Sequence, residues 1–122
     1  MKVSTLRALS PADGRYAGKV GALRDIFSEY GLIRFRVLAE VRWLQCLADE
    51  SAIPELGPLS PVMKDVLNKL VDDFSLDDAE RVKAIEETTN HDVKAVEYFI
   101  RERLGDGPET GPLKDFLHFG CT

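Results

Sequence analysis

The sequence carries its clearest structural signal at residues 60–74, SPVMKDVLNKLVDDF. Ser60 is a favourable N-cap, and Pro61 stands at the first helical position, where its missing N–H costs nothing. Apolar side chains then recur at steps of three and four, the period of an amphipathic α-helix: Met63, Val66, Leu67, Leu70, Val71 and Phe74. The stretch therefore predicts a helix with one apolar face over residues 60–74.

A second helical pattern, over residues 20–50, precedes this segment. Its apolar side chains recur at helical spacing, and Gly31 marks a place where the run bends or breaks into a helix pair. The half that follows Gly31 is apolar on more than one face, so we expect several neighbours to bury it. In this interpretation Trp43 is a core residue and Cys46 a small buried one.

The rest of the chain divides into a loop and shorter helices. Residues 1–19 combine Pro and Gly with no helical or strand period, which is typical of a loop. Ser75 and Asp78 resemble a capping box and open the next helix. Further helices are expected over 75–87, 90–104 and 112–119. No segment alternates long enough to predict a strand, so we expect an all-α fold of about four to six helices in one domain, 1–122.

Composition narrows the functional classes. The chain has 122 residues with 16 basic and 21 acidic side chains, a formal net charge of −5, which argues against a nucleic-acid or anionic-membrane binder. Residues 72–87 hold seven acidic and two basic side chains, so one alternative is a non-enzymatic helical interaction module with an acidic docking face. No apolar run approaches the ~20 residues that span a bilayer.

The two cysteines, Cys46 and Cys121, lie far apart in the sequence. No CxxC or similar ligand spacing surrounds them, and only two histidines are available, so neither a metal site nor a disulfide framework is predicted. We expect a reducing, cytoplasmic compartment. His118 stands between two apolar residues and is expected to be a packing or helix-end residue.

Two polar clusters exceed what helix packing requires. Arg15 and Tyr16 stand in the glycine-flanked loop, where a guanidinium can clamp a phosphate or carboxylate; the alternative is a surface arginine and a half-buried tyrosine that hold the loop. Asn90, His91 and Asp92 stand at an expected helix start, where free N–H groups favour anions; the alternative is ordinary helix capping.

Four stretches, taken in order, resemble the start of the bacterial adenylosuccinate lyase family, a branch of the fumarase/aspartase superfamily. They are SPADGRY at 10–16, IFSEYGL at 26–32, EVRWL at 40–44 and TTNHDVKAVEYF at 88–99. The similarity runs along the whole chain, and the last stretch is the most specific. The resemblance implies a helical N-terminal domain of that superfamily.

The resemblance also implies an activity. Members of this family are homotetrameric, cofactor-free C–N lyases of purine biosynthesis. They remove fumarate by β-elimination from adenylosuccinate, giving AMP, and from the succinylated aminoimidazole carboxamide ribotide SAICAR, giving AICAR. A base takes a proton from the succinyl group and an acid protonates the departing nitrogen. The implied partners are a purine nucleotide and the remainder of the same enzyme.

Site residues carry over by position. Arg15 and Tyr16 match a loop that contacts the nucleotide, and Asn90, His91 and Asp92 match a second substrate-binding turn, with His91 assisting the acid or binding phosphate. Thr122 matches a residue that holds a substrate carboxylate. The family's general acid and base lie beyond position 122, so we expect an N-terminal portion that is inactive alone. We also expect Arg15 and His91 to face one anionic pocket.

Overall fold

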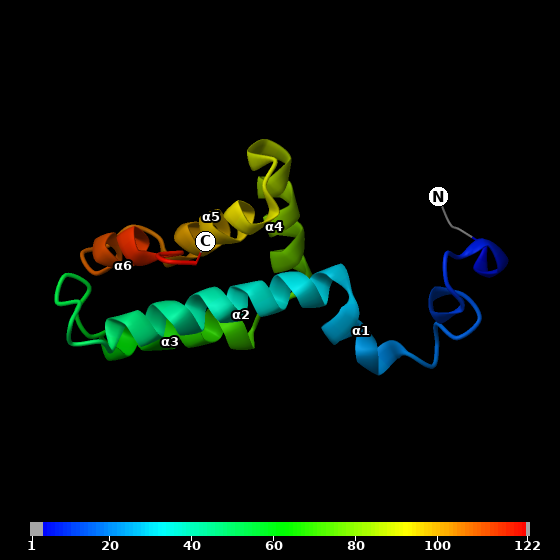
Figure 1. Cartoon of the computed structure of the whole chain (residues 1–122), viewed down its shortest axis with the longest axis horizontal. Coiled ribbons are helices and arrows are strands. Elements are labelled where there is room, and N and C mark those ends of the chain that lie inside the picture. Colours follow the sequence, from blue (N-terminus) through cyan, green and yellow to red (C-terminus); the bar gives the residue numbers. More distant parts are fainter. Residues whose placement is uncertain (1–3, 122) are drawn as a thin grey trace. The chain divides into compact units, whose positions relative to one another are not determined.

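The computed structural model describes residues 4–121, which form six α-helices and two short 3₁₀ helices (Figure 1). No strand occurs within these residues, so the predicted all-α class is confirmed. The elements are η1 (Thr5–Arg7), η2 (Pro11–Asp13), α1 (Gly21–Phe27), α2 (Glu29–Ala48), α3 (Pro61–Asp72), α4 (Leu76–Thr89), α5 (Asp92–Leu104) and α6 (Thr110–Phe116).

The chain divides into two compact units, residues 1–32 and 33–122. The first unit contains η1, η2, α1 and the first turn of α2, and the second contains the remainder of α2 with α3 to α6. That 1–122 forms a single domain stays a prediction.

Arg24 of α1 organises the first unit. Its guanidinium donates to the Asp13 carboxylate at 2.9 Å and to the carbonyl of Ala17 at 3.2 Å, which ties the second half of the expected loop to the helix. The loop is more ordered than its composition indicates, because η1 and η2 lie within it. Gly14 is required there, since a Cβ at this position would meet the carbonyl oxygen of Thr5 at 2.5 Å.

The break in the helical run over 20–50 occurs at Ser28, and the expectation of Gly31 as the bend is wrong. Ser28 takes an extended conformation with ψ of 170° between α1 and α2. Its hydroxyl accepts the N–H of Gly31 at 3.1 Å, which satisfies one of the free donors at the start of α2. Gly31 is needed for space, because a Cβ there would lie 2.5 Å from the carbonyl oxygen of Ile26.

The core of the second unit is built from buried apolar side chains of α2, α3, α4, α5 and α6. Hydrogen bonds from Arg42 and Gln45 of α2 to Asn68 of α3, at 2.8 and 3.0 Å, accompany the two helices where they run alongside each other in Figure 1. Phe74 meets Phe99 edge to face, with ring centroids 5.8 Å apart. The largest fully buried side chains are Val37, Val41, Leu44, Leu67, Val82, Val96, Phe99 and Ile100.

Two predicted core positions on α2 are wrong. Trp43 is 40% exposed, and Cys46 is exposed as well. Elsewhere on α2, Ile33 and Val37 are buried while Phe35 is exposed. A helix that is apolar on more than one face does not reveal from spacing alone which side its neighbours cover.

Helix caps explain where α3 and α4 begin. The Ser60 hydroxyl accepts the N–H of Met63 at 3.2 Å, with Pro61 at the first helical position. Ser75 and Asp78 form both bonds of the predicted capping box, at 3.1 and 3.0 Å. Asp78 also pairs with Arg103 of α5. These caps fix the two helices from local sequence.

Ion pairs join α4 to α5 and affect the pKa of Asp78. Arg81 donates to both oxygens of Glu102, at 3.0 and 2.6 Å. Partial burial by itself raises the pKa of Asp78, but the Ser75 N–H and the Arg103 guanidinium outweigh it and leave that pKa below its usual value.

In the described residues no helix combines the length and apolar character needed to cross a membrane.

Candidate functional site

The Arg15–Tyr16 pair lies on the turn between η2 and α1, in the first unit. The Arg15 guanidinium carbon is 5.2 Å from the centre of the Tyr16 ring, and the Lys19 ammonium is 5.8 Å from it, so two cations lie close to one aromatic ring. The backbone N–H of Tyr16 donates to the carbonyl of Pro11 at 2.8 Å. Tyr16 is 40% exposed. This surface can receive an anion.

The second predicted cluster forms a tight turn between α4 and α5. Asn90 takes a left-handed conformation, with φ of 52°, and its N–H donates to the carbonyl of Glu86 at 2.8 Å, which ends α4. His91 follows in an extended conformation as the N-cap of α5, and Asp92 is the first residue of that helix. The sequence therefore places a helix end, a cap and a helix start at three consecutive residues.

The donors at the start of α5 are already engaged by this turn. The Asp92 carboxylate accepts the N–H of Val93 at 2.9 Å, and Nδ1 of His91 accepts the N–H of Lys94 at 3.1 Å. A neutral imidazole that accepts at Nδ1 carries its proton on Nε2. His91 is exposed and can therefore offer Nε2–H to a ligand while it caps the helix.

Arg36 connects this turn to α2. Its guanidinium donates to the Asp92 carboxylate at 2.8 Å. This hydrogen bond, with that from the N–H of Val93, holds the pKa of Asp92 below its usual value. The pair is partly exposed, so its role is to position the turn more than to stabilise the fold.

A hollow of about 340 Å³ lies beside this ion pair, within the second unit. Its polar lining comes from α2 and from the segment after α6, and its apolar lining from α2 and the first turns of α5. The residues are Arg36, Ala39, Glu40, Trp43, Val93, Val96, His118 and Cys121.

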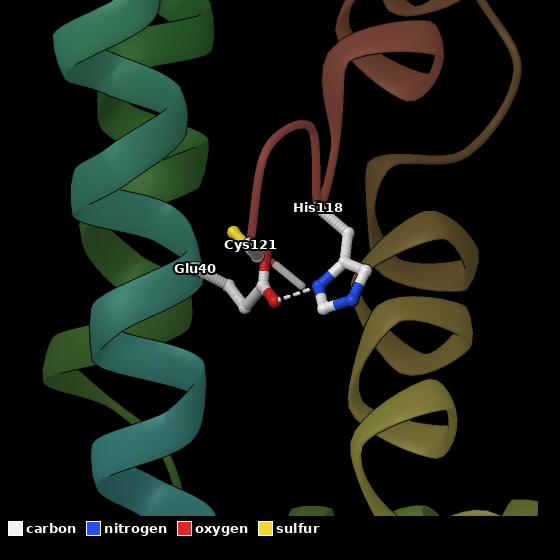
Figure 2. A group of neighbouring side chains, drawn as sticks. All are labelled: Glu40, His118 and Cys121. Atoms are coloured by element: carbon white, nitrogen blue, oxygen red, sulfur yellow. Dashed lines mark hydrogen bonds and ion pairs between the residues drawn. The ribbon is translucent and has the colours of Figure 1, made fainter.

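Three of these side chains converge in the hollow. Figure 2 shows Glu40 reaching from α2 toward His118 and Cys121, which lie on the segment that follows α6. The Glu40 carboxylate contacts Nδ1 of His118, and Sγ of Cys121 lies 3.9 Å from its other oxygen. Glu40 is 7% exposed, and a buried polar group is stabilised by contacts of this kind. Burial and the Glu40 charge both raise the pKa of the Cys121 thiol.

The segment that carries His118 and Cys121 is fixed to α2 by Trp43. The indole N–H donates to the carbonyl of Phe119 at 2.6 Å. Within the segment, the N–H of Cys121 donates to the carbonyl of His118 at 3.2 Å, and His118 takes a left-handed φ of 66°. The turn therefore presents both side chains to Glu40.

Chemically, the Glu40–His118 pair is a proton-transfer or binding group. A carboxylate beside Nδ1 fixes the orientation and tautomer of an imidazole, which leaves Nε2 available for a ligand. Sequence reasoning missed this pair and assigned His118 to packing or to a helix end. No local signal could reveal it, because the carboxylate comes from 78 positions earlier in the chain.

The predicted site residues are therefore distributed over both units. Arg15 and Tyr16 lie in the first unit, and Asn90, His91 and Asp92 lie in the second. Thr122 lies outside the described residues. The common anionic pocket for Arg15 and His91 stays a prediction.

In comparisons with known proteins, the chain is similar to lyases. A family model described as "Lyase" matches residues 14–122. Over 122 residues the chain is 54% identical to "Adenylosuccinate lyase" of Escherichia coli (strain K12) and 53% identical to that of Haemophilus influenzae (strain ATCC 51907 / DSM 11121 / KW20 / Rd). It is 38% identical to the protein of the same name from Legionella pneumophila (strain Corby). Each match covers 100% of this chain and 27% of the relative.

Proposed function

The chain belongs to the lyase family, and from this premise we propose that it is the N-terminal part of an adenylosuccinate lyase. Its relatives of that name match it from end to end, and the chain spans about a quarter of their length. The proposed reaction is β-elimination of fumarate from adenylosuccinate, giving AMP, and from SAICAR, giving AICAR. The proposed substrate is a purine nucleotide, and the enzyme needs no cofactor.

The single observation that carries the proposal is the second unit's turn at 90–92, together with the hollow beside it. Arg36 binds Asp92 at 2.8 Å and also lines the hollow, so the turn is fixed next to a cavity that contains Glu40 and His118. An imidazole donor from His91 and the imidazole of His118 suit a substrate with phosphate and two carboxylates.

In this proposal the residues of the chain bind and orient the nucleotide. Arg15 and Tyr16 contact the phosphate, and Asn90, His91 and Asp92 form a second contact, with Thr122 at a substrate carboxylate. His91 donates from Nε2, either to the phosphate or to the departing nitrogen. The general base and the main general acid are supplied by the remainder of the enzyme, so the 122-residue chain alone is expected to be inactive.

The wider setting is also part of the proposal. The assembly is a homotetramer whose active sites draw on more than one subunit, and the compartment is the cytoplasm. Neither a nucleic acid nor a membrane is a partner, in keeping with the acidic net charge of −5.

The acidic stretch offers less support for a docking module than its composition indicates. Two of its acids are engaged inside the chain, because Asp78 pairs with Arg103 and Glu86 lies 2.9 Å from the Lys83 ammonium. The acids at the start of α4 are also accounted for by its capping and its dipole. We therefore favour the lyase.

Fumarate release by the chain joined to the remainder of the enzyme tests the proposal. We expect turnover from the joined protein and none from the 122-residue chain. In the joined protein, Arg15→Ala is expected to raise KM for adenylosuccinate about tenfold or more, because one charge-assisted contact to phosphate is lost. Arg7→Ala, which changes another exposed cation of the first unit, is the matched control. Turnover by the chain alone, or an equal effect of both substitutions, would refute the assignment.

A further inference from the structure

We propose that Glu40, His118 and Cys121 form a binding site for a divalent transition-metal ion of the zinc class. The three residues offer one carboxylate oxygen, one imidazole nitrogen and one thiol sulfur, and these ligand atoms all lie within 4.8 Å of one another (Figure 2). The inference concerns metal binding alone and does not depend on the proposed lyase activity.

The donor set selects the class of metal. Zinc is bound in proteins by cysteine sulfur, histidine nitrogen and carboxylate oxygen, whereas magnesium and calcium take oxygen ligands. Three protein ligands leave one position of a four-coordinate ion open. The cluster borders the hollow of about 340 Å³, so water or a small ligand can occupy that position.

The ligands are held together by contacts that involve no metal. His118 and Cys121 are separated by two residues and joined by the hydrogen bond from the Cys121 N–H to the His118 carbonyl at 3.2 Å. Trp43, three residues after Glu40 on α2, donates to the carbonyl of Phe119 within the same turn at 2.6 Å. A preformed turn of this kind lowers the ordering cost of binding an ion.

Burial explains why a cation suits the cluster. The Glu40 side chain is 8% exposed and the His118 side chain 14% exposed, while Cys121 is exposed and provides an entry path. A divalent ion would compensate the buried carboxylate more completely than a neutral imidazole does. No comparable group of three histidine, cysteine or acidic ligands is found elsewhere in residues 4–121.

The proton balance of binding is simple. The thiol of Cys121 loses its proton to solvent and binds as thiolate. The imidazole proton moves from Nδ1 to Nε2, which frees Nδ1 for the metal, and the Glu40 carboxylate exchanges its bond to Nδ1–H for a bond to the ion. One proton is therefore released for each ion bound to the neutral-histidine form.

Cobalt(II) titration of the 122-residue chain tests the proposal, because a Co²⁺–thiolate bond gives a charge-transfer absorption that water and oxygen ligands do not. We expect one Co²⁺ per chain, a thiolate band, and displacement by an equivalent of Zn²⁺. Cys121→Ser is expected to abolish the band and to weaken Zn²⁺ binding in calorimetry at least about tenfold. Glu40→Gln and His118→Asn are expected to weaken binding while the band, at saturation, persists.

The chain supplies matched controls, since it has a second cysteine and a second histidine. Cys46→Ser and His91→Asn should leave the band and the Zn²⁺ affinity unchanged. Circular dichroism identifies any variant that fails to fold, and Cys121→Ser is the decisive one because its side chain is exposed. Absence of a thiolate band in the unsubstituted chain, or loss of the band on Cys46→Ser, would overturn the site.

Discussion

Arg36 of α2 binds Asp92, the first residue of α5, with Nη1 2.8 Å from Oδ2. This bond spans 56 positions of sequence and fixes the turn at 90–92 to the helix that also carries Glu40. The turn at 90–92 and the hollow, both in the second unit, are therefore positioned by one helix, α2.

Removal of Arg36 should change the titration of Asp92. In Arg36→Ala the carboxylate loses its main hydrogen bond, so its pKa is expected to rise toward the ordinary value, as measured by carbon-detected NMR. The folded pKa of Asp92 is depressed, so the pair stabilises the fold above the unfolded pKa, and this contribution is lost as pH falls through the folded value. Arg24→Ala, which breaks an ion pair in the first unit, should leave Asp92 unchanged. A pKa of Asp92 unmoved by Arg36→Ala would exclude the pair in solution.

Asp78 should contribute pH-dependent stability. We expect Asp78→Asn to lower the free energy of unfolding by about 1 kcal/mol at neutral pH, because it weakens both the capping box and the Arg103 pair. The folded pKa of Asp78 is depressed, so the loss should shrink as pH falls through that value. Urea denaturation followed by circular dichroism at several pH values measures this. Asp77→Asn, at the neighbouring exposed position, should cost less; an equal loss for both would show that the cap is unimportant.

Substitution of glycine by alanine should have opposite effects on the free energy of unfolding at two helical positions. Gly31→Ala is expected to destabilise the chain by about 1–3 kcal/mol, since its Cβ would lie 2.5 Å from the carbonyl oxygen of Ile26. At Gly21 no atom lies within 4 Å of such a Cβ, and Gly21→Ala should stabilise the chain by about 0.5 kcal/mol through its helix propensity. Chemical denaturation of both variants gives the comparison. A neutral Gly31→Ala would mean that the backbone at residue 31 does not approach the Ile26 carbonyl this closely in solution.

Substitutions of His91 should separate its role as a helix cap from its role in substrate binding or proton transfer. Asn is a good N-cap, so His91→Asn should preserve stability within a few tenths of a kcal/mol, whereas His91→Ala should cost about 1 kcal/mol. In the joined enzyme both substitutions remove the Nε2 donor. A rise of about tenfold in KM at constant kcat would assign His91 to binding, and a fall in kcat of about 10²-fold or more would assign it to proton transfer. Full activity of His91→Asn would remove His91 from the site.

Local signals explain which parts of the fold could be predicted from sequence. Ser60 with Pro61, and Ser75 with Asp78, define helix starts through residues within four positions of each other, and the structure has both caps. The predicted position of the helix break was wrong because glycine has two separate uses, turning the chain and allowing close approach of other atoms. Gly31 serves the second, while Ser28 terminates α1.

The hollow could not be predicted, because its parts come from distant segments. Glu40 and His118 are 78 positions apart, and Trp43 and Phe119 are 76 apart. An apolar-looking helix and a histidine between hydrophobic neighbours indicate packing when each is taken alone. The turn at 90–92, in contrast, could be predicted from sequence. Its three candidate residues are consecutive and lie in the stretch that most resembles a known family.

The indole bond from Trp43 to Phe119 has a practical consequence. Trp43 is the single tryptophan of the chain, and its ring is part exposed while its N–H is held by the last turn. Release of that turn would hydrate the indole and shift its fluorescence emission to longer wavelength. The molecule thus contains an intrinsic optical reporter, needing no label, for whether its C-terminal turn is docked on α2.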